Sequence, residues 1–239
     1  MLKSYFITGL RNLLKQKFYS FINILGLTVG LTCSTLIFLY VSHELSYDKF
    51  HADYENTYRV GITGSLAGQT FNAVVACAPM AQTIQEEFPE VESAIRLNSW
   101  DNVLISYEDK AFTEENILLA DSNFFEFFNF KLIEGDPSTA LTGVNKIVVS
   151  EDAAIKYFNW KGPGDSAPLG KIIHLGTGDR TCEVTGIVEN MPSNSHIPYD
   201  MVFSMVSWDQ SKSTAWVSNN FYTYFKKRPD VPIEETQEK

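Results

Sequence analysis

A run of 25 residues without a charged side chain, Phe18 to Ser42, constrains this chain more than any other feature of its sequence. About 20 predominantly apolar residues in a helix are enough to cross the hydrocarbon core of a bilayer. A cleaved signal peptide would have a shorter apolar region, of roughly 7 to 15 residues, followed by a small-residue cleavage site. The run therefore predicts a permanent transmembrane helix over 18–42.

The charges on the two sides of this helix are distributed unequally. All 29 aspartates and glutamates lie from Glu44 onward, whereas the helix is preceded by no acid and by four basic residues, Lys3, Arg11, Lys15 and Lys17. Basic residues that flank a membrane helix remain on its cytoplasmic side. We therefore expect residues 1–17 in the cytosol and everything after the helix outside.

Residues 1–17 also show a helical pattern. Arg11 and Lys15 lie opposite an apolar face made of Leu2, Phe6, Leu10 and Leu13. An amphipathic helix of this kind can lie in the membrane interface, but the same residues also fit a helix that runs straight into the span. The sequence leaves both arrangements open.

Within the span, Gly26 and Gly30 form a GxxxG pair. Two glycines on one face of a membrane helix let the backbone of a second helix approach closely. We expect these two residues to be helix packing positions.

The exported part carries 15 basic residues against 29 acidic ones. A surface with this balance repels phosphate backbones, which excludes nucleic acid as a partner. The part is long enough to bury a hydrophobic core without disulfide staples. Its two cysteines, Cys77 and Cys182, are interpreted as buried free thiols, although a disulfide between them is an open alternative.

The exported part begins with residues 43–57, where the spacing of Tyr47, Phe50, Tyr54 and Tyr58 predicts that the membrane helix continues as a stalk. The rest, 58–239, alternates short β-rich runs with helical ones, so the predicted fold class is α+β. Asp121 and Ser150 are expected to cap two of the helices. The predicted helices are PMAQTIQEEF, SNFFEFF and SEDAAIKYF, and the predicted strands are YRVGITGSL, SAIRLNSW, NVLISYED, ENILLAD, NKIVV, KIIHLG, TCEVTGIVEN, MVFSMV and NFYTYFKK.

Motifs that carry catalytic chemistry are missing from the sequence. It contains no GxxxxGK[ST] loop for nucleotide phosphates, no HExxH, no GxSxG and no SxxK. His43, Asp48 and His51 are close in sequence but have no third ligand motif after them, and the NSHIPYD loop has no nucleophile. We therefore expect no catalytic, metal or cofactor site in this chain, which is interpreted as not being an enzyme.

Several blocks of the chain occur together in one known family. The opening LRNLLKQKFYSFINILGLTVGLTCSTLIFLYVSHELSYDKFHADYENTYRV is followed by DSNFFEFFNFKLIEGDPSTAL, NKIVVSEDAAIKYF, PLGKII and VTGIVENMPSNSHIPYD. In this order they resemble the N-terminal part of MacB/FtsX-type ABC transporter permeases, especially those of Bacteroidetes-like bacteria. Five ordered blocks are more specific than any single motif.

The resemblance implies a permease subunit in the bacterial inner membrane, with its main domain in the periplasm. The subunit would act as a homodimer or with a paired permease, and a separate cytosolic ATPase would bind the ATP. Some relatives also use a periplasmic adaptor. Arg11, Lys15 and Lys17 would belong to the cytosolic coupling region. ATP would move the helix and stalk, and the periplasmic domain would then act in export or extraction of a substrate.

The resemblance also has structural implications. The core domain over 58–239 would have two lobes, with the second lobe inserted at about 144–200. Full-length relatives carry further membrane helices after this domain, so the chain is expected to be a fragment that ends within it. A reading from a different class remains, in which the chain is a membrane-tethered sensor or ligand-binding module.

Overall fold

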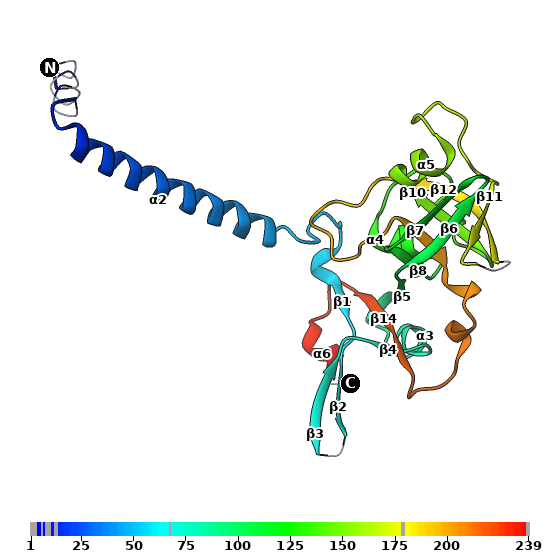
Figure 1. Cartoon of the computed structure of the whole chain (residues 1–239). Coiled ribbons are helices and arrows are strands. Elements are labelled where there is room, and N and C mark those ends of the chain that lie inside the picture. Colours follow the sequence, from blue (N-terminus) through cyan, green and yellow to red (C-terminus); the bar gives the residue numbers. More distant parts are fainter. Residues whose placement is uncertain are drawn as a thin grey trace. The chain divides into compact units, whose positions relative to one another are not determined.

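The computed structural model describes residues 4–5, 7, 11, 14–66, 68–177 and 180–237. It divides into two compact units, residues 1–47 and residues 48–239. The first unit contains the membrane helix and the second contains the sheet. Figure 1 shows both units.

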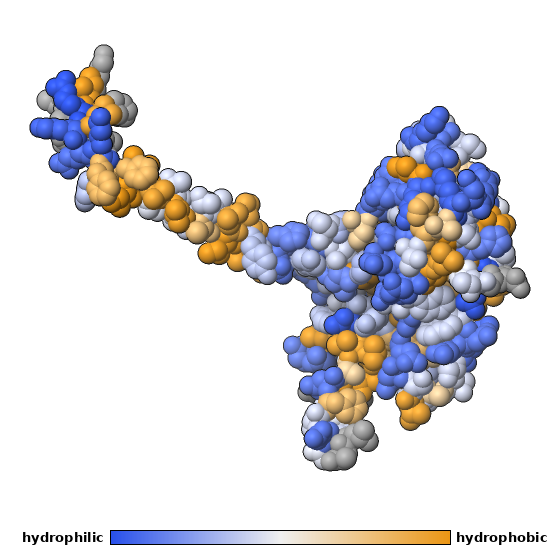
Figure 2. Space-filling view, viewed as in Figure 1, coloured by the Kyte–Doolittle hydropathy of each residue, from blue (hydrophilic) through white to orange (hydrophobic). Residues whose placement is uncertain are grey.

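Helix α2, Lys17–Glu44, contains the whole predicted span. It is long and apolar enough to cross a membrane, and almost all of its side chains are exposed, as the apolar surface along it in Figure 2 shows. The hydroxyl of Thr28 donates a hydrogen bond to the carbonyl oxygen of Ile24 at 2.8 Å, so this polar side chain is satisfied within the helix. The helix is therefore built to present its surface to lipid, and the protein is membrane-anchored. The apolar face predicted from residues 2, 6, 10 and 13 lies outside the described residues.

The predicted helical stalk over 43–57 is wrong. Helix α2 ends at Glu44, and turns follow until a short 3-10 helix, η1, Tyr54–Asn56. Asp48 has a φ of 58°, which is a left-handed conformation that no α-helix can contain. The aromatic spacing that suggested a helix instead places Phe50 against Phe130 of the domain, with ring centroids 6.1 Å apart.

The second unit is organised around one large mixed sheet. Along its main path the order of strands is β1-β14-β5-β8-β13-β10-β12-β11-β6-β7, with β4 beside β14 and β9 beside β12. The pairs β10 with β12 and β13 with β8 are parallel, and the remaining pairs in this sheet are antiparallel. A separate two-stranded sheet contains β2 and β3.

The strand bounds along the main sheet are β1 Thr57–Arg59, β4 Ala76–Cys77, β5 Val91–Trp100, β6 Val103–Tyr107, β7 Lys110–Glu114, β8 Ile117–Ala120, β9 Leu132–Glu134, β10 Lys146–Ser150, β11 Ile172–Leu175, β12 Arg180–Val188, β13 Met201–Ser204 and β14 Asn219–Lys227. The separate hairpin consists of β2 Ile62–Leu66 and β3 Gln69–Ala73.

Several of these elements differ from the prediction. Strands β3, β4, β7 and β9 were not predicted from the sequence. The strand expected over 58–66 is broken between Arg59 and Ile62, so that β1 joins the main sheet and β2 leaves it. The strand expected over 201–206 stops at Ser204 and turns into a 3-10 helix, η2, Met205–Ser207. A second 3-10 helix, η3, Asp209–Lys212, follows. Residues 144–200 provide β10, β11 and β12 of the same sheet, and the bounds of an inserted lobe stay a prediction.

The core lies on both faces of the central strands β8, β13 and β10. Successive side chains of a strand point to opposite faces, and in β8 Leu119 belongs to one apolar cluster while its neighbour Leu118 belongs to the other. The same division separates Phe203 from Val202 in β13. Strands buried on both faces are typical of sheets that are covered by other elements on each side.

Different helices cover the two faces. Helix α5, Glu151–Phe158, contributes Tyr157 to the first cluster. Helix α4, Phe124–Phe128, contributes its four buried phenylalanines to the second. Helix α3, Met80–Glu87, packs on β5 and β14, and a short helix, α6, Ile233–Gln237, follows the last strand.

The two predicted helix caps have different outcomes. Ser150 is confirmed, because its hydroxyl accepts a hydrogen bond from the backbone N–H of Ala153 at 3.2 Å. Asp121 is wrong as a cap, since Asn123 occupies that position in α4. The Asp121 carboxylate instead receives the guanidinium of Arg96, with Nη2 2.8 Å from Oδ1 and Nε 3.0 Å from Oδ2. The carboxylate oxygens of Asp121 that a helix cap would use are therefore occupied by this partly buried ion pair.

We expect Ser150→Ala to lower the free energy of unfolding by about 1 kcal/mol, because the backbone N–H of Ala153 in the first turn of α5 loses its side-chain acceptor. Thermal unfolding of the detergent-solubilised chain, followed by near-ultraviolet circular dichroism, measures the change. Ser122→Ala, an exposed serine before α4, is the matched control and should change stability by less than about 0.5 kcal/mol. Equal effects of the two substitutions would contradict the role of the cap.

Candidate functional site

A connected polar site of the second unit joins residues 48–57, which follow the membrane helix in the chain, to the sheet. We call it the juxtamembrane cluster and define it as Asp48, His51, Asp53, His196, Tyr224 and Lys226. These residues line one cavity of about 470 Å³, together with Tyr54, Thr57, Arg59, Phe127 and Phe128. They come from residues 48–57, from the loop 192–200, and from β14.

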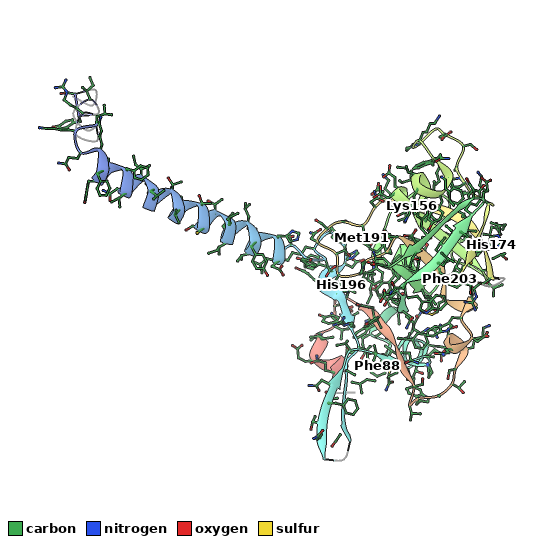
Figure 3. The ribbon with its side chains drawn as sticks, viewed as in Figure 1. Phe88, Lys156, His174, Met191, His196 and Phe203 are labelled. Atoms are coloured by element: carbon green, nitrogen blue, oxygen red, sulfur yellow. The ribbon has the colours of Figure 1, made fainter. Side chains whose placement is uncertain are left out.

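Asp48 pairs with the loop 192–200 through both backbone and side chain. Its N–H donates to the carbonyl of Asn194 at 3.0 Å, and its Oδ1 accepts from the N–H of His196 at 3.1 Å. Its Oδ2 lies 2.6 Å from His196 Nδ1. Aspartate is one of the few residues that tolerate a left-handed backbone conformation, so the φ of Asp48 is compatible with this arrangement. Figure 3 labels His196 at this position.

His196 extends the pairing to the sheet. Its Nε2 lies 2.8 Å from the hydroxyl oxygen of Tyr224 in β14. Because Nδ1 faces a carboxylate, that nitrogen carries the proton in the neutral ring, and Nε2 is then left to accept from the Tyr224 hydroxyl. Burial raises the pKa of Tyr224, so the phenol stays protonated and can donate. Asp48, His196 and Tyr224 thus form a continuous hydrogen-bonded chain.

Two more contacts hold the same segment. The Nδ1 of His51 lies 2.6 Å from the carbonyl oxygen of Phe128, and since a carbonyl only accepts, Nδ1 carries a proton. The His51 ring is 8% exposed and packs against the rings of Phe50, Phe128 and Phe130. Burial lowers the pKa of His51, so the ring is neutral at pH 7. Lys226 donates to Asp53 Oδ2 at 2.7 Å.

The residues singled out in the sequence lie elsewhere. Gly26 and Gly30 are exposed on α2, and a β-carbon on either would meet no described atom within 4 Å. Arg11, Lys15 and Lys17 are exposed in the first unit. Their roles in helix packing and cytosolic coupling stay predictions.

Sequence reasoning missed most of the juxtamembrane cluster. It set the NSHIPYD loop aside because the loop has no nucleophile, and it considered Asp48 and His51 only as metal ligands together with His43. Among the described residues no group of three or more histidines, cysteines, aspartates or glutamates is placed to hold a metal ion. The pairing of Asp48 with a residue 148 positions away has no local pattern. The one available signal was the mixture of histidine, asparagine and aspartate in a single loop.

Other polar groups of the domain serve the fold. The Glu114 carboxylate is buried and accepts from the Tyr157 hydroxyl and from Lys156 Nζ, the latter at 2.7 Å, which joins β7 to α5. Cys77 and Cys182 are both buried and free, as expected. Burial raises the pKa of Cys182 to about 12, so this thiol is not a reactive nucleophile.

These features define a membrane-anchored protein whose mixed α/β domain binds the segment that follows its own membrane helix. A family model, the MacB-like periplasmic core domain, matches residues 20–239. The chain therefore belongs to the MacB-like periplasmic core domain family, whose members are parts of ABC transporter permeases. The match includes most of α2 as well as the whole second unit.

Solved structures agree with this assignment. A domain assigned to a permease protein from Porphyromonas gingivalis is similar at 26% identity, with a TM-score of 0.69 and coverage of 79% of each chain. The periplasmic region of MacB from Actinobacillus actinomycetemcomitans shares the fold at 17% identity, with a TM-score of 0.55, and the match covers 77% of this chain and 79% of that chain. No curated protein sequence matches this chain.

The buried neutral His51 predicts a pH dependence of stability. Its pKa in the folded state is lower than the value of 6.5 for an unperturbed histidine, so below about pH 6.5 the unfolded chain binds more protons at this residue than the folded chain. Stability from this residue is complete above that pH and is lost as the pH falls toward the folded-state pKa.

We expect His51→Asn, whose amide can still donate to Phe128 O, to flatten the loss of thermal stability between about pH 6.5 and pH 5. His174 is exposed on β11, and His174→Asn is the control that should keep the wild-type pH dependence. Melting temperatures of the wild type and both variants across this pH range test the prediction. An unchanged slope in His51→Asn would show that His51 does not titrate with folding.

Proposed function

We propose that this chain is a permease subunit of a MacB/FtsX-type ABC transporter that carries motion from a separate cytosolic ATPase to a domain on the other side of the membrane. The motion would serve the export or extraction of a substrate. The observation that carries the proposal is the juxtamembrane cluster, which ties the domain to the residues immediately after a membrane helix in a member of a permease family.

The short connection between helix and cluster supports this role. Only Leu45, Ser46 and Tyr47 separate the end of α2 from Asp48. The four residue steps from Glu44 to Asp48 span at most about 14 Å when fully extended. A displacement of the helix end that exceeds this reach must be passed on to Asp48. From Asp48 the hydrogen bonds continue to His196 and to Tyr224 in β14, which is a long strand of the sheet.

The cytosolic side of the proposal rests on charge. Arg11, Lys15 and Lys17 precede a span without charges, and the acids all follow it. This asymmetry favours an N-terminus in the cytosol and the domain in the periplasm of a bacterial inner membrane. The basic residues would then face an ATPase subunit, which supplies the nucleotide site that this sequence lacks. A permease dimer, packed at Gly26 and Gly30, and a periplasmic adaptor are further parts of the proposal.

We expect a photo-crosslinking amino acid at Gln16, an exposed position beside the basic residues, to form an adduct with a cytosolic ATPase in membranes where the complex is assembled. The reason is that residues 1–17 would form the contact with that subunit. Mass spectrometry of the adduct should identify a polypeptide with a nucleotide-binding GxxxxGK[ST] loop.

The control places the same amino acid at Thr113, an exposed residue of β7. It should give no adduct with the ATPase, because the domain would lie across the membrane. Failure at Gln16 in a complex that still co-purifies, or equal labelling from Thr113, would refute the cytosolic coupling.

The cluster itself is tested by Asp48→Asn, which keeps the tolerance for a left-handed backbone but removes the charge opposite His196. If the cluster transmits motion, the ATPase rate of the reconstituted complex should change by about two- to thirtyfold, which corresponds to roughly 0.5–2 kcal/mol of coupling. His196→Gln should have a similar effect, and the double variant should add little to either change.

Glu189→Gln is the matched control for the charge change. Glu189 pairs with Lys131 at 3.1 Å on the exposed surface, and such pairs contribute little to stability. Its ATPase rate should equal that of the wild type. If Asp48→Asn also leaves the rate unchanged while the complex stays assembled, the juxtamembrane cluster is a structural clasp and has no part in coupling.

A further inference from the structure

A second cavity of the second unit adjoins the juxtamembrane cluster. It has a volume of about 340 Å³, and Arg59, His196 and Tyr224 line both this cavity and the cavity of about 470 Å³ described above. The hydrogen bond between His196 and Tyr224 therefore lies where the two cavities meet. Whatever fills the second cavity touches residues of the juxtamembrane cluster.

The middle of this second cavity is apolar. Leu97 of β5, Leu118 of β8 and Tyr222 of β14 line it from adjacent strands, and all three pack with the same apolar cluster on one face of the sheet. Ile197 and Val74 extend the apolar lining. We call this cavity the sheet groove. Cavities of about 300 to 1,000 Å³ that are lined mainly by apolar and aromatic side chains, with few polar groups, are typical ligand sites.

The two ends of the sheet groove carry opposite charges. Arg59 is opposite Tyr224 in the register of β1 and β14, and Tyr224 is opposite Ile95 of β5. Asp101 comes directly after β5, six positions beyond Ile95. At about 3.3 Å per residue, this separation amounts to about 20 Å along the strand. The sheet groove therefore has a guanidinium at one end and a carboxylate at the other.

Both charges are available to a ligand. Among the described residues, Arg59 and Asp101 take part in no ion pair, and both are exposed. Burial raises the pKa of Tyr224, and the nearby charge of Arg59 offsets part of this rise. An anion held by Arg59 is thus placed beside the Tyr224 hydroxyl.

We propose that the sheet groove binds a short peptide with free ends and apolar side chains, with its carboxylate at Arg59 and its ammonium group at Asp101. Ionised groups paired in this way form charge-assisted hydrogen bonds. A single amino acid or a phosphoethanolamine headgroup holds its two charges too close together to reach both ends. An extended peptide of about four residues spans about 14 Å, and the side chains of Arg59 and Asp101 cover the remaining distance.

The charge of the domain also favours a zwitterion. After the membrane helix the chain carries 15 basic residues against 29 acidic ones, so a ligand with negative charge alone is repelled. A ligand with positive charge alone leaves the guanidinium of Arg59 without a partner. Between the charged ends, Ser99 and Asn116 line the sheet groove with uncharged polar groups, which suit the amides of a peptide.

Binding in the sheet groove reaches the juxtamembrane cluster through its carboxylate end. The peptide carboxylate at Arg59 lies beside Tyr224, from which hydrogen bonds lead to His196 and then to Asp48. An occupied groove would thus bias the contact that holds the segment after the membrane helix. This link between binding and transport rests on the proposed function, whereas the binding itself does not.

The test measures peptide binding to the full chain in lipid nanodiscs by equilibrium dialysis. The probe is the radiolabelled tetrapeptide Ala-Leu-Val-Ala, and empty nanodiscs measure its partition into lipid. The free peptide should bind saturably. Acetylation of its amine or amidation of its carboxylate should each weaken binding about tenfold or more, because each removes a charge-assisted hydrogen bond. No saturable binding, or equal binding of the blocked peptides, overturns the proposal.

Variants of the chain assign the two ends. Arg59→Gln should weaken binding of the free peptide about tenfold or more but have little further effect on the amidated peptide. Asp101→Asn should behave in the same way toward the acetylated peptide. Lys161→Gln and Asp109→Asn, at exposed positions outside the groove, are the matched controls and should bind like the wild type. Melting temperatures verify folding, and the reverse pairing of variants with blocked ends overturns the orientation.

The binding experiment contains no ATPase, so it is independent of the coupling test. Absent binding overturns the peptide site even where Asp48→Asn alters the ATPase rate. Saturable binding that depends on both peptide ends supports the site, even where Asp48→Asn leaves the ATPase rate unchanged and the proposed coupling fails.

Discussion

The structure of the second unit depends on the burial of both faces of β8, β13 and β10. Because these short strands alternate between two apolar clusters, neither face can be exposed, and helices α4 and α5 must cover opposite sides. In this sheet β14 lies two strands away from β8, through β5, and the loop 192–200 ends where β13 begins at Met201. The loop 192–200 and Tyr224 are therefore positioned by the core before they make any polar contact.

The juxtamembrane cluster depends on the positions of these core elements. Asp48 pairs with His196 of the loop 192–200, and His51 forms a hydrogen bond with the carbonyl of Phe128 at the end of α4. Asp53 forms an ion pair with Lys226 of β14. Three different elements of the core thus hold one short segment, and each contact combines a charged or polar pair with nearby aromatic packing. Partly buried pairs of this kind are screened less by salt than exposed ones. A connection made of several such contacts would transmit displacement better than a flexible linker, which supports the proposed coupling role.

Two stretches of this chain lack charge. The span from Phe18 to Ser42 lacks it because an ion in a bilayer core is costly. Residues 60–85 lack it as well, and the side chains of β3 within this stretch are mostly exposed in the described structure.

Much of the secondary structure followed from the sequence. The membrane helix, α3, α5 with its Ser150 cap, and the strands β11 and β12 were each predicted, because their signals are local: length, periodicity and a cap. The errors came where tertiary contacts compete with local preference. Asp121 pairs with Arg96 and does not cap a helix. The helix predicted from the aromatic spacing of residues 47–58 does not form, because Asp48 has a left-handed conformation.

What the sequence determined by itself was the anchor, its charge asymmetry, the α+β texture and, through ordered resemblance, the family. These depend on composition and on neighbours in the chain. The tertiary structure alone decided that Asp48, His196 and Tyr224 form one hydrogen-bonded chain, and that β2 and β3 leave the main sheet. The contact of Asp48 with His196, 148 positions further along the chain, follows from how the core closes, and no local pattern in the sequence records that.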